Sequence, residues 1–532
     1  MKRLLLLLIA ACVIAVSVTA CGNSGSPSGT TAGGGGSEST EASAEGTEAA
    51  AETGGEEAAA GGEMTVGAAS GIPQLNPAKA GTAWEEVMKP LLWDGLTKLN
   101  EEGEPEADLA TKWTPSAGNK TWTFDLRPGV KWSNGKPITP EDIVKTFEYY
   151  LDPDTASQWL TSLEPIQKVS AKGNSIVFNL KNANALLPNI VSNIKVLDMS
   201  ALKSIDQEPV VSGPFMVKSF TPEVEVTMVP NPEFFGEAPK LEELKLVKES
   251  DSTAAVTALR AGDLDALWSI PASDAEQLAS EPSLQMIEPE VTGVYVSWEM
   301  DMTAPPFNDL RAREALAYAT DREAILKAAY YNLGEVSKTN TPLAENSPWF
   351  GGDLKEFPYD VAKAKKLFEE AGVTKLTWWG VSDQYPEWNT SAQILQASLK
   401  EAGVTLDIKN SDLSTWPDKF YPAGKSYPGL IIPNFQSYQA NPYSQFSFPL
   451  SGRCECNWNS DEFDSTFEAA LAASDEGERN ELWDQAQEII NKEVPLIIPV
   501  QPKVVTAAKS EVAGVWVDAT GTPHFESAGF AG

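Results

Sequence analysis

The sequence predicts an α/β protein, and three features of residues 64–532 support that fold class. Segments with the two-residue period of a half-buried strand alternate along the chain with segments of helical periodicity. Gly, Pro and Asn separate these segments at the positions where turns are expected. The body is also longer than one hydrophobic core supports, so we expect two or three lobes.

The N-terminal part of this body shows both kinds of segment. A strand is expected at Met64–Ala68 and a helix at Glu85–Leu92, while Thr121–Leu126 alternates polar and apolar residues as a strand does. Thr139 is the expected N-cap of the next helix, because Pro140 follows it at the first helical position and acidic residues occupy the first turn. This order predicts a sheet with a capped helix against it.

The rest of the body continues the alternation. The strand-like runs are rich in apolar and β-branched residues, and several helical runs end at Gly. The expected strands are Val224–Val229, Thr377–Gly380, Val404–Ile408 and Val494–Val500. The expected helices are Thr253–Leu259, Asp309–Ala319, Val361–Glu370, Ser391–Glu401, Phe463–Ala473 and Glu478–Asn491. Interleaved strands and helices of this kind are typical of α/β folds.

The start of the chain has the pattern of a bacterial lipoprotein signal. A basic beginning precedes an apolar core, Leu4–Val16, which is shorter than a membrane-spanning helix. Val18-Thr19-Ala20-Cys21 resembles a lipobox, which implies removal of residues 1–20 and acylation of Cys21. A retained anchor helix and a buried core helix are the alternatives for the apolar core, and the terminal position and lipobox argue against both.

Residues 21–63 are expected to form a lipidated, flexible leash. Between Gly22 and Glu63 the chain consists mainly of Gly, Ser, Thr, Ala and eight Glu, with no aromatic, basic or branched aliphatic residue. Such a composition cannot bury enough apolar surface to fold. We therefore expect a protein tethered to the extracellular face of the bacterial cell membrane, in the periplasmic space or cell envelope.

The charge of the chain argues against nucleic acid as a partner. It carries 75 Asp and Glu against 40 Lys and Arg, a formal net charge of −35. Phosphate backbones and anionic lipid headgroups repel such a surface. Solubility is the simplest interpretation of this acidity, which also favours cationic solutes modestly.

The residue types needed for most enzyme classes are scarce. His524 is the single histidine, which excludes His-dependent triads and two-histidine zinc motifs. Gly424-Lys425-Ser426 resembles the end of a phosphate loop, but Lys419 stands where that loop requires Gly. We expect no cofactor and no enzyme activity. A surface glycosidase with a carboxylate pair is the remaining catalytic alternative.

Two cysteines stay in the mature body, since Cys12 leaves with the signal and Cys21 is the expected lipid attachment site. Cys454 and Cys456 can form a bridge in a small ring, stay as thiols, pair elsewhere or bind a soft metal. Two cysteines alone do not complete a metal site, so we expect no metal.

Four groups of residues carry a resemblance to a known family. They are 91–96 with 109–113, 123–139 with 152–157, 212–215 with 231–235 and 259–265, and 306–322. The run Leu126-Arg127-Pro128-Gly129-Val130-Lys131-Trp132 is characteristic. In this order the groups resemble the family 5 extracellular solute-binding proteins of ABC importers, the oligopeptide- and dipeptide-binding lipoprotein group.

The resemblance implies a two-lobed, periplasmic-binding-protein-like clamp of the class II type, with three domains of mixed sheets and flanking helices. Domain I would take residues 64–101, 209–294 and 501–532, domain II residues 102–208, and domain III residues 295–500. A solute would bind between domains I and III, and closure would bury it. The implied partners are a small-molecule solute and ABC permease subunits in the membrane, and we expect a monomer.

The implied ligand site contains one departure from the family pattern. Peptide binders of the family use an aspartate in domain III for the ligand's α-ammonium group, and Tyr438 stands at that position. A buried ammonium without a carboxylate partner is costly. Either Glu85 or Glu86 serves instead, or the ligand is not an ordinary peptide.

Tryptophans suggest a second ligand class. Several of the 16 tryptophans are expected to face the cleft, although core packing is the alternative for each. Aromatic faces stack on sugars, so a cello- or xylo-oligosaccharide is the alternative ligand. Arg453 would pair with a ligand carboxylate. The candidate ligand-binding residues are Trp84, Glu85, Glu86, Tyr295, Trp298, Trp379, Trp388, Phe435, Gln436, Ser437, Tyr438, Asn441 and Arg453.

The leading hypothesis is therefore a lipid-anchored receptor that captures a peptide or peptide-like solute and delivers it to a permease. A sensor or adhesin that uses the same clamp without a permease is the further alternative.

Overall fold

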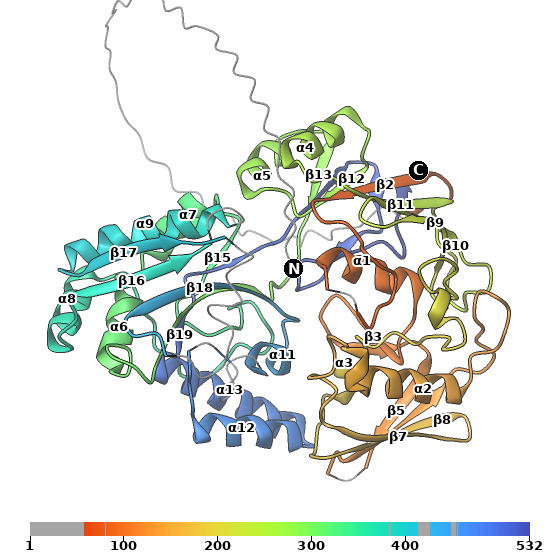
Figure 1. Cartoon of the computed structure of the whole chain (residues 1–532), viewed down its shortest axis with the longest axis horizontal. Helices are drawn as coiled ribbons and strands as arrows, with labels where there is room; N and C mark the ends of the chain where they lie inside the picture. Colours follow the sequence, from red (N-terminus) through yellow and green to blue (C-terminus); the bar gives the residue numbers. More distant parts are fainter. Residues whose placement is uncertain are drawn as a thin grey trace, which may run out of the picture. The chain divides into compact units, whose positions relative to one another are not determined.

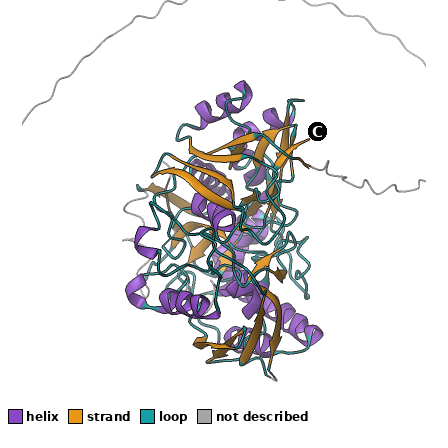
Figure 2. Ribbon diagram, turned by 90° about the vertical axis from the view of Figure 1, so that its right-hand side faces the viewer, coloured by secondary structure: helices purple, strands orange, loops and turns teal. Residues whose placement is uncertain are grey.

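The computed structural model (Figure 1) describes residues 58–531 except 80, 117, 382–384, 413–425, 448–453 and 455. The expected signal and Cys21 lie outside the described residues. Among the described helices, none is long and apolar enough to cross a membrane. Figure 2 shows that strands and helices are both distributed throughout this part of the chain. The predicted α/β class with mixed sheets and flanking helices is confirmed.

A seven-stranded mixed sheet draws its strands from three separate stretches of sequence. Its order is β13-β21-β12-β2-β11-β10-β9. The bounds are β2 Glu63–Ala68, β9 Phe215–Thr221, β10 Glu225–Pro230, β11 Glu243–Lys248, β12 Ala266–Trp268, β13 Leu284–Ile287 and β21 Thr506–Lys509. Strand β2 pairs in parallel with β11 and β12, whereas β21 is antiparallel to its neighbours. The helices of this region are α1 Ala83–Leu92, α4 Ser252–Ala261 and α5 Ala272–Ala279.

A four-stranded antiparallel sheet follows the order β5-β6-β8-β7. The bounds are β5 Ala110–Pro115, β6 Thr121–Leu126, β7 Ile166–Lys172 and β8 Ser175–Leu180. Helix α2 (Pro140–Leu151) packs on it, with the rings of Phe147 and Phe178 edge to face at 4.9 Å. Trp122, Phe124 and Leu126 are buried, which is the alternation that predicted this strand.

A five-stranded mixed sheet has the order β17-β16-β18-β14-β19. Its strands are β14 Val294–Met300, β16 Lys375–Gly380, β17 Thr405–Asn410, β18 Leu430–Ser437 and β19 Leu496–Ile497. The accompanying helices are α6 Leu310–Ala319, α7 Arg322–Ala329, α8 Val361–Glu370, α9 Pro386–Glu401, α11 Pro442–Ser447, α12 Asp461–Ala472 and α13 Glu476–Glu493. Helices α12 and α13 pack on each other beside α11 and share a separate hydrophobic cluster.

Short elements complete the described chain. They are α3 Leu187–Val191, the 3-10 turns η1 Pro153–Thr155 and η2 Leu202–Ser204, and the strands β1 Ala58–Ala59, β3 Thr97–Leu99, β4 Pro105–Ala107, β15 Gly334–Val336, β20 Val500–Pro502, β22 Val512–Ala513, β23 Trp516–Val517, β24 Pro523–His524 and β25 Gly529–Ala531. Strand β23 pairs with β24, and β15 pairs with β20.

Two sequence expectations differ from the structure. The single strand expected at Val494–Val500 is wrong: Val494 has φ 50° and caps α13, and β19 and β20 belong to different sheets. Pro499 lies between the two strands and has no N–H to continue a ladder. At the end of the expected leash, Ala58–Ala59 pairs with β25 and Glu63 begins β2, because backbone pairing does not require apolar side chains.

Helix α2 begins with the capping box expected from Thr139. The Asp142 amide donates to Thr139 Oγ1 at 3.3 Å, and the Thr139 amide donates to Asp142 Oδ2 at 2.9 Å. We expect Thr139→Ala to lower the free energy of unfolding by about 1 kcal/mol, measured by urea denaturation. Thr257→Ala, in the exposed middle of α4, is the control and should cause no comparable loss.

Candidate ligand-binding site

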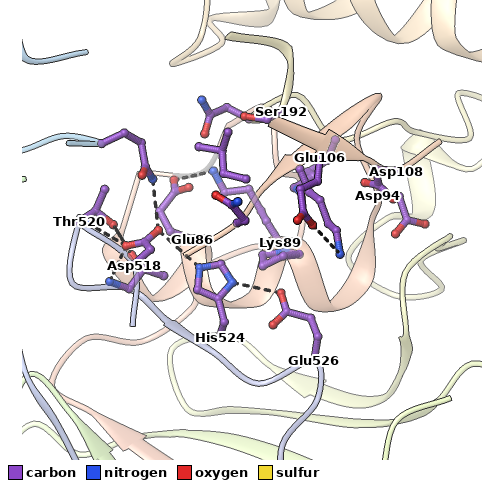
Figure 3. A pocket seen from close by; sticks show the side chains of 18 of the residues that line it. Glu86, Lys89, Asp94, Glu106, Asp108, Ser192, Asp518, Thr520, His524 and Glu526 are labelled. Carbon is purple, nitrogen blue, oxygen red and sulfur yellow. Dashed lines mark hydrogen bonds and ion pairs between the residues drawn. The ribbon is translucent and has the colours of Figure 1, made fainter. Parts of the chain in front are cut away.

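A cavity of about 940 Å³ lies among segments that are far apart in the sequence. Part of its wall comes from α1 and the residues that follow it, and another part from the segment around Asn189–Lys195. The end of β18 and helix α11 contribute a third part, and the C-terminal residues around β23 and β24 a fourth. Figure 3 shows polar and charged side chains of this cavity.

In the described part of the wall formed by β18 and α11, no lining side chain is charged. Its lining residues are Ser437, Tyr438, Gln439, Asn441, Tyr443, Ser444 and Ser447. Hydrogen bonds tie this wall to the C-terminal segment: Ser437 Oγ donates to the Thr520 carbonyl at 3.0 Å, and Gln439 Nε2 donates to Asp518 Oδ2 at 3.2 Å. The charged lining residues that the structure describes therefore belong to the other walls.

Helix α1 places an ion pair on one of the charged walls. Lys89 is 2% exposed, and its ammonium donates to Glu86 Oε1 at 2.5 Å (Figure 3). The same ammonium lies 4.8 Å from the centre of the Trp159 ring, and Gln158 Nε2 donates to Glu86 Oε1 at 3.2 Å. Burial lowers the pKa of Lys89, and the charge of Glu86 opposes that shift.

Strands β23 and β24 place the single histidine between two carboxylates. His524 Nδ1 lies 3.2 Å from Glu526 Oε1, and its Nε2 lies 3.4 Å from Asp518 Oδ2 (Figure 3). The imidazole stacks on Trp516 with 3.8 Å between ring centres. Burial favours the neutral ring, but the charge of Glu526 and the hydrogen bonds to both carboxylates raise the pKa of His524 to about 9. The triad of Asp518, His524 and Glu526 then carries one net negative charge at neutral pH.

Two further carboxyl groups lie close together in the loop regions after α1. Asp94 and Asp108 are each 6% exposed, and Asp108 Oδ2 accepts a hydrogen bond from the Gly95 amide at 2.8 Å. Burial raises the pKa of Asp94 well above its usual value, with the charge of Asp108 as a second cause. Burial also raises the pKa of Asp108. Both groups are shifted toward the protonated form.

Four of the residues proposed from the sequence line the cavity: Glu86, Ser437, Tyr438 and Asn441. Glu85 instead serves the N-terminus of α1, where its Oε2 accepts hydrogen bonds from the Gly81 amide at 2.6 Å and the Thr82 amide at 2.7 Å. Of the two glutamates considered as ammonium partners, only Glu86 lies in the cavity wall.

Most of the proposed aromatic residues lie elsewhere. Trp84 is 1% exposed and stacks at 5.4 Å on Trp268, which itself lines the cavity. Tyr295 and Trp298 are fully buried in β14. The other four lie in the region of β16, β18 and α9. The ring centre of Trp379 lies 5.2 Å from the Lys409 ammonium, and Gln436 is buried. Trp388 stacks on Tyr385 with 4.2 Å between ring centres, and the ring centre of Phe435 lies 6.4 Å from that of Tyr385.

Arg453 and Cys21 lie outside the described residues. Cys454 and Cys456 are joined by a disulfide, which selects one of the alternatives left open by the sequence. In the part of the chain that the structure describes, no group of three or more His, Cys, Asp or Glu is arranged to hold a metal ion.

Sequence reasoning missed most of the charged wall. Lys89, Lys195, Asp518 and Glu526 were not proposed, although all four line the cavity. One local signal was present, because Lys195 interrupts the apolar run Ile194-Lys195-Val196-Leu197. Charged residues are rarely buried unless they have a partner, so a lysine within an apolar run is a candidate site residue.

Comparisons with known proteins agree with this architecture. A family model described as "Bacterial extracellular solute-binding proteins, family 5 Middle" matches residues 104–451. The dipeptide-binding protein of Escherichia coli (strain K12) is 24% identical over 477 residues, which cover 79% of this chain and 85% of that protein. The oligopeptide-binding protein OppA of Bacillus subtilis (strain 168) is 25% identical over 481 residues, covering 82% and 87%.

A solved structure shares the fold over nearly the whole chain. The ABC transporter substrate-binding protein CtaP from Listeria monocytogenes matches with a TM-score of 0.79 and 23% identity, covering 89% of this chain and 100% of that one. The fold and the matched segment define a bacterial extracellular solute-binding protein. The chain belongs to family 5 of that class.

Proposed function

We propose that this protein is the solute receptor of an ABC importer and that it captures a peptide or peptide-like solute in the cavity described above. The cavity carries this proposal: about 940 Å³ is at the upper end of the ~300–1,000 Å³ typical of small-molecule sites and suits a short peptide. The printed names of the two relatives, a dipeptide-binding and an oligopeptide-binding protein, support the same ligand class.

The lining suits the chemistry of a peptide. The uncharged wall offers hydroxyl and amide groups that can hydrogen-bond a ligand backbone without selecting one side chain. The charged walls offer partners for ligand termini. A solute of this kind is held by non-covalent contacts and leaves unchanged, and we propose no enzyme activity.

The sheet composition supports the three-domain division that we propose. The seven-stranded sheet takes its strands from residues 63–68, 215–287 and 506–509, the four-stranded sheet from 110–180, and the five-stranded sheet from 294–497. Among the described strands, the pairs that cross the proposed limits are short: β3 with β4, β15 with β20, and β1 of the proposed leash with β25. Closure of domain I on domain III would bury the solute.

We also propose where this receptor resides and which proteins it meets there. Acylation of Cys21 would anchor the receptor to the outer face of the membrane, where a monomer delivers solute to the permease subunits. Two or more acyl chains would hold it there stably, unlike a single chain. The lipobox and the composition of the leash support this location.

Titration calorimetry tests the ligand class. The purified body should bind members of a set of free di- to pentapeptides and not cello- or xylo-oligosaccharides, and small-angle scattering should show compaction only with the bound peptides. Binding of the oligosaccharides alone would replace the peptide with the sugar alternative. Cleavage of any bound compound would overturn the receptor proposal.

A further inference from the structure

Lys195 is a buried cation of the cavity wall. The residue is 8% exposed and lines the cavity. Within the described residues its ammonium makes no ion pair and no hydrogen bond. Lys89, the other buried lysine of the cavity, is in contrast paired with Glu86. The Lys195 ammonium is not among the fully enclosed polar atoms, so its three donors remain accessible from the cavity.

The backbone around Lys195 is fixed on both sides. The Tyr150 hydroxyl donates to the Lys195 carbonyl at 3.3 Å, and the Val196 amide donates to the Asp94 carbonyl at 2.9 Å. The flanking side chains of Ile194 and Val196 have no exposed surface. The lysine is therefore held in the wall by its neighbours, independently of any contact made by its own ammonium group.

The charges that face Lys195 act on it without contacting it. Lys89, Asp94, Asp108 and Glu526 are all within electrostatic range. The shift of Asp94 and Asp108 toward the protonated form weakens their support for the lysine charge. Glu526 stays ionised, because its pKa is lowered, but its carboxylate bonds to His524 and not to Lys195.

A second donor lies two residues away. Asn193 is half-buried and lines the cavity. Among the described residues, its side-chain amide has no hydrogen-bond partner. An ammonium and an amide together can bind the two oxygens of a carboxylate. Among the described residues of β18, α11 and the segment between them, no cation lines the cavity.

We propose that Lys195, assisted by Asn193, binds a carboxylate group of the solute, so that ligands of this receptor carry a free carboxylate. The inference rests on the proposed function and specifies its ligand class further. It assigns the carboxylate partner to the segment after α3, at a position distinct from Arg453, for which the sequence suggested the same role. The lysine ammonium is thus kept unpaired for the ligand.

The first test compares two pools of random-sequence tetrapeptides, one with free C-terminal carboxylates and one with C-terminal amides. Each pool is equilibrated with the protein, and retained peptides are measured by ultrafiltration and mass spectrometry. The wild-type protein should prefer the free acids by roughly 10- to 100-fold, the effect of one charge-assisted hydrogen bond. Lys195→Met should remove this preference. Lys203→Met, which removes an exposed lysine outside the cavity, should keep it.

The second test is the urea denaturation midpoint of the ligand-free proteins. Because the Lys195 ammonium makes no contact with the described part of the protein that Lys195→Met would break, the midpoint of the variant should not be lower than that of the wild type. A lower midpoint, or equal retention of acids and amides by the wild type, overturns the inference. If the wild-type protein retains neither pool, the peptide proposal is overturned instead. The denaturation midpoint then shows whether the Lys195 ammonium stabilises the fold.

Discussion

Trp298→Ala is expected to lower the free energy of unfolding by about 3–5 kcal/mol, as large-to-small changes of a buried aromatic residue do. Trp298 is 0% exposed in β14, where its backbone pairs with Pro433 of β18 and Ile497 of β19. Its ring packs edge to face on Trp378 at 5.2 Å. Alanine would leave a cavity in the hydrophobic cluster that Trp298 and Trp378 share with the helices beside the five-stranded sheet.

Urea denaturation measures this loss of stability. The dependence of the free energy of unfolding on urea concentration should stay unchanged. Tyr331→Ala is the control, since that aromatic side chain is 53% exposed and should contribute far less. Unchanged stability of Trp298→Ala together with weaker ligand binding would contradict the structural role and support the cleft position that the sequence suggested.

His524 should make the stability of the protein fall as the pH rises from about 6.5 to about 9. Its folded-state pKa, about 9, lies above the ordinary value of 6.5. The charged ring therefore contributes stability that is fully present below about pH 6.5 and is lost as the pH rises through the folded-state pKa. The shift corresponds to about 3 kcal/mol.

Urea denaturation at pH values from 6 to 10 measures this dependence. His524→Gln keeps a polar side chain but cannot carry the charge, so its stability should be lower at pH 6 and nearly constant over this range. A variant whose stability falls in parallel with that of the wild type would show that another group causes the dependence.

Local signals in the sequence predicted much of the secondary structure. Helix α8 has the expected bounds, Val361–Glu370, because Asp360 caps it and a regular apolar stripe runs through it. Helix α2 likewise begins at Pro140 after Thr139. Such signals lie within a few residues of one another and do not depend on the rest of the chain.

The candidate site was harder to predict, because its walls come from residues far apart in the sequence. Tyr438 and Asn441 come to line the same cavity as Asp518 and Glu526 only after the sheets have formed. The burial of Trp298 likewise depends on β18 and β19 pairing on either side of β14. Side-chain type alone cannot separate a tryptophan in a core from one in a cleft.

The most direct test of the receptor account is whether filling the cavity prevents peptide capture. Ser444 of α11 lines the cavity, so Ser444→Trp should remove retention of the free-acid tetrapeptide pool while leaving the folded protein intact by circular dichroism. Ser465→Trp, on the exposed face of α12, should retain the pool as the wild type does. Retention by Ser444→Trp equal to that of the wild type would contradict the assignment of this cavity as the ligand site.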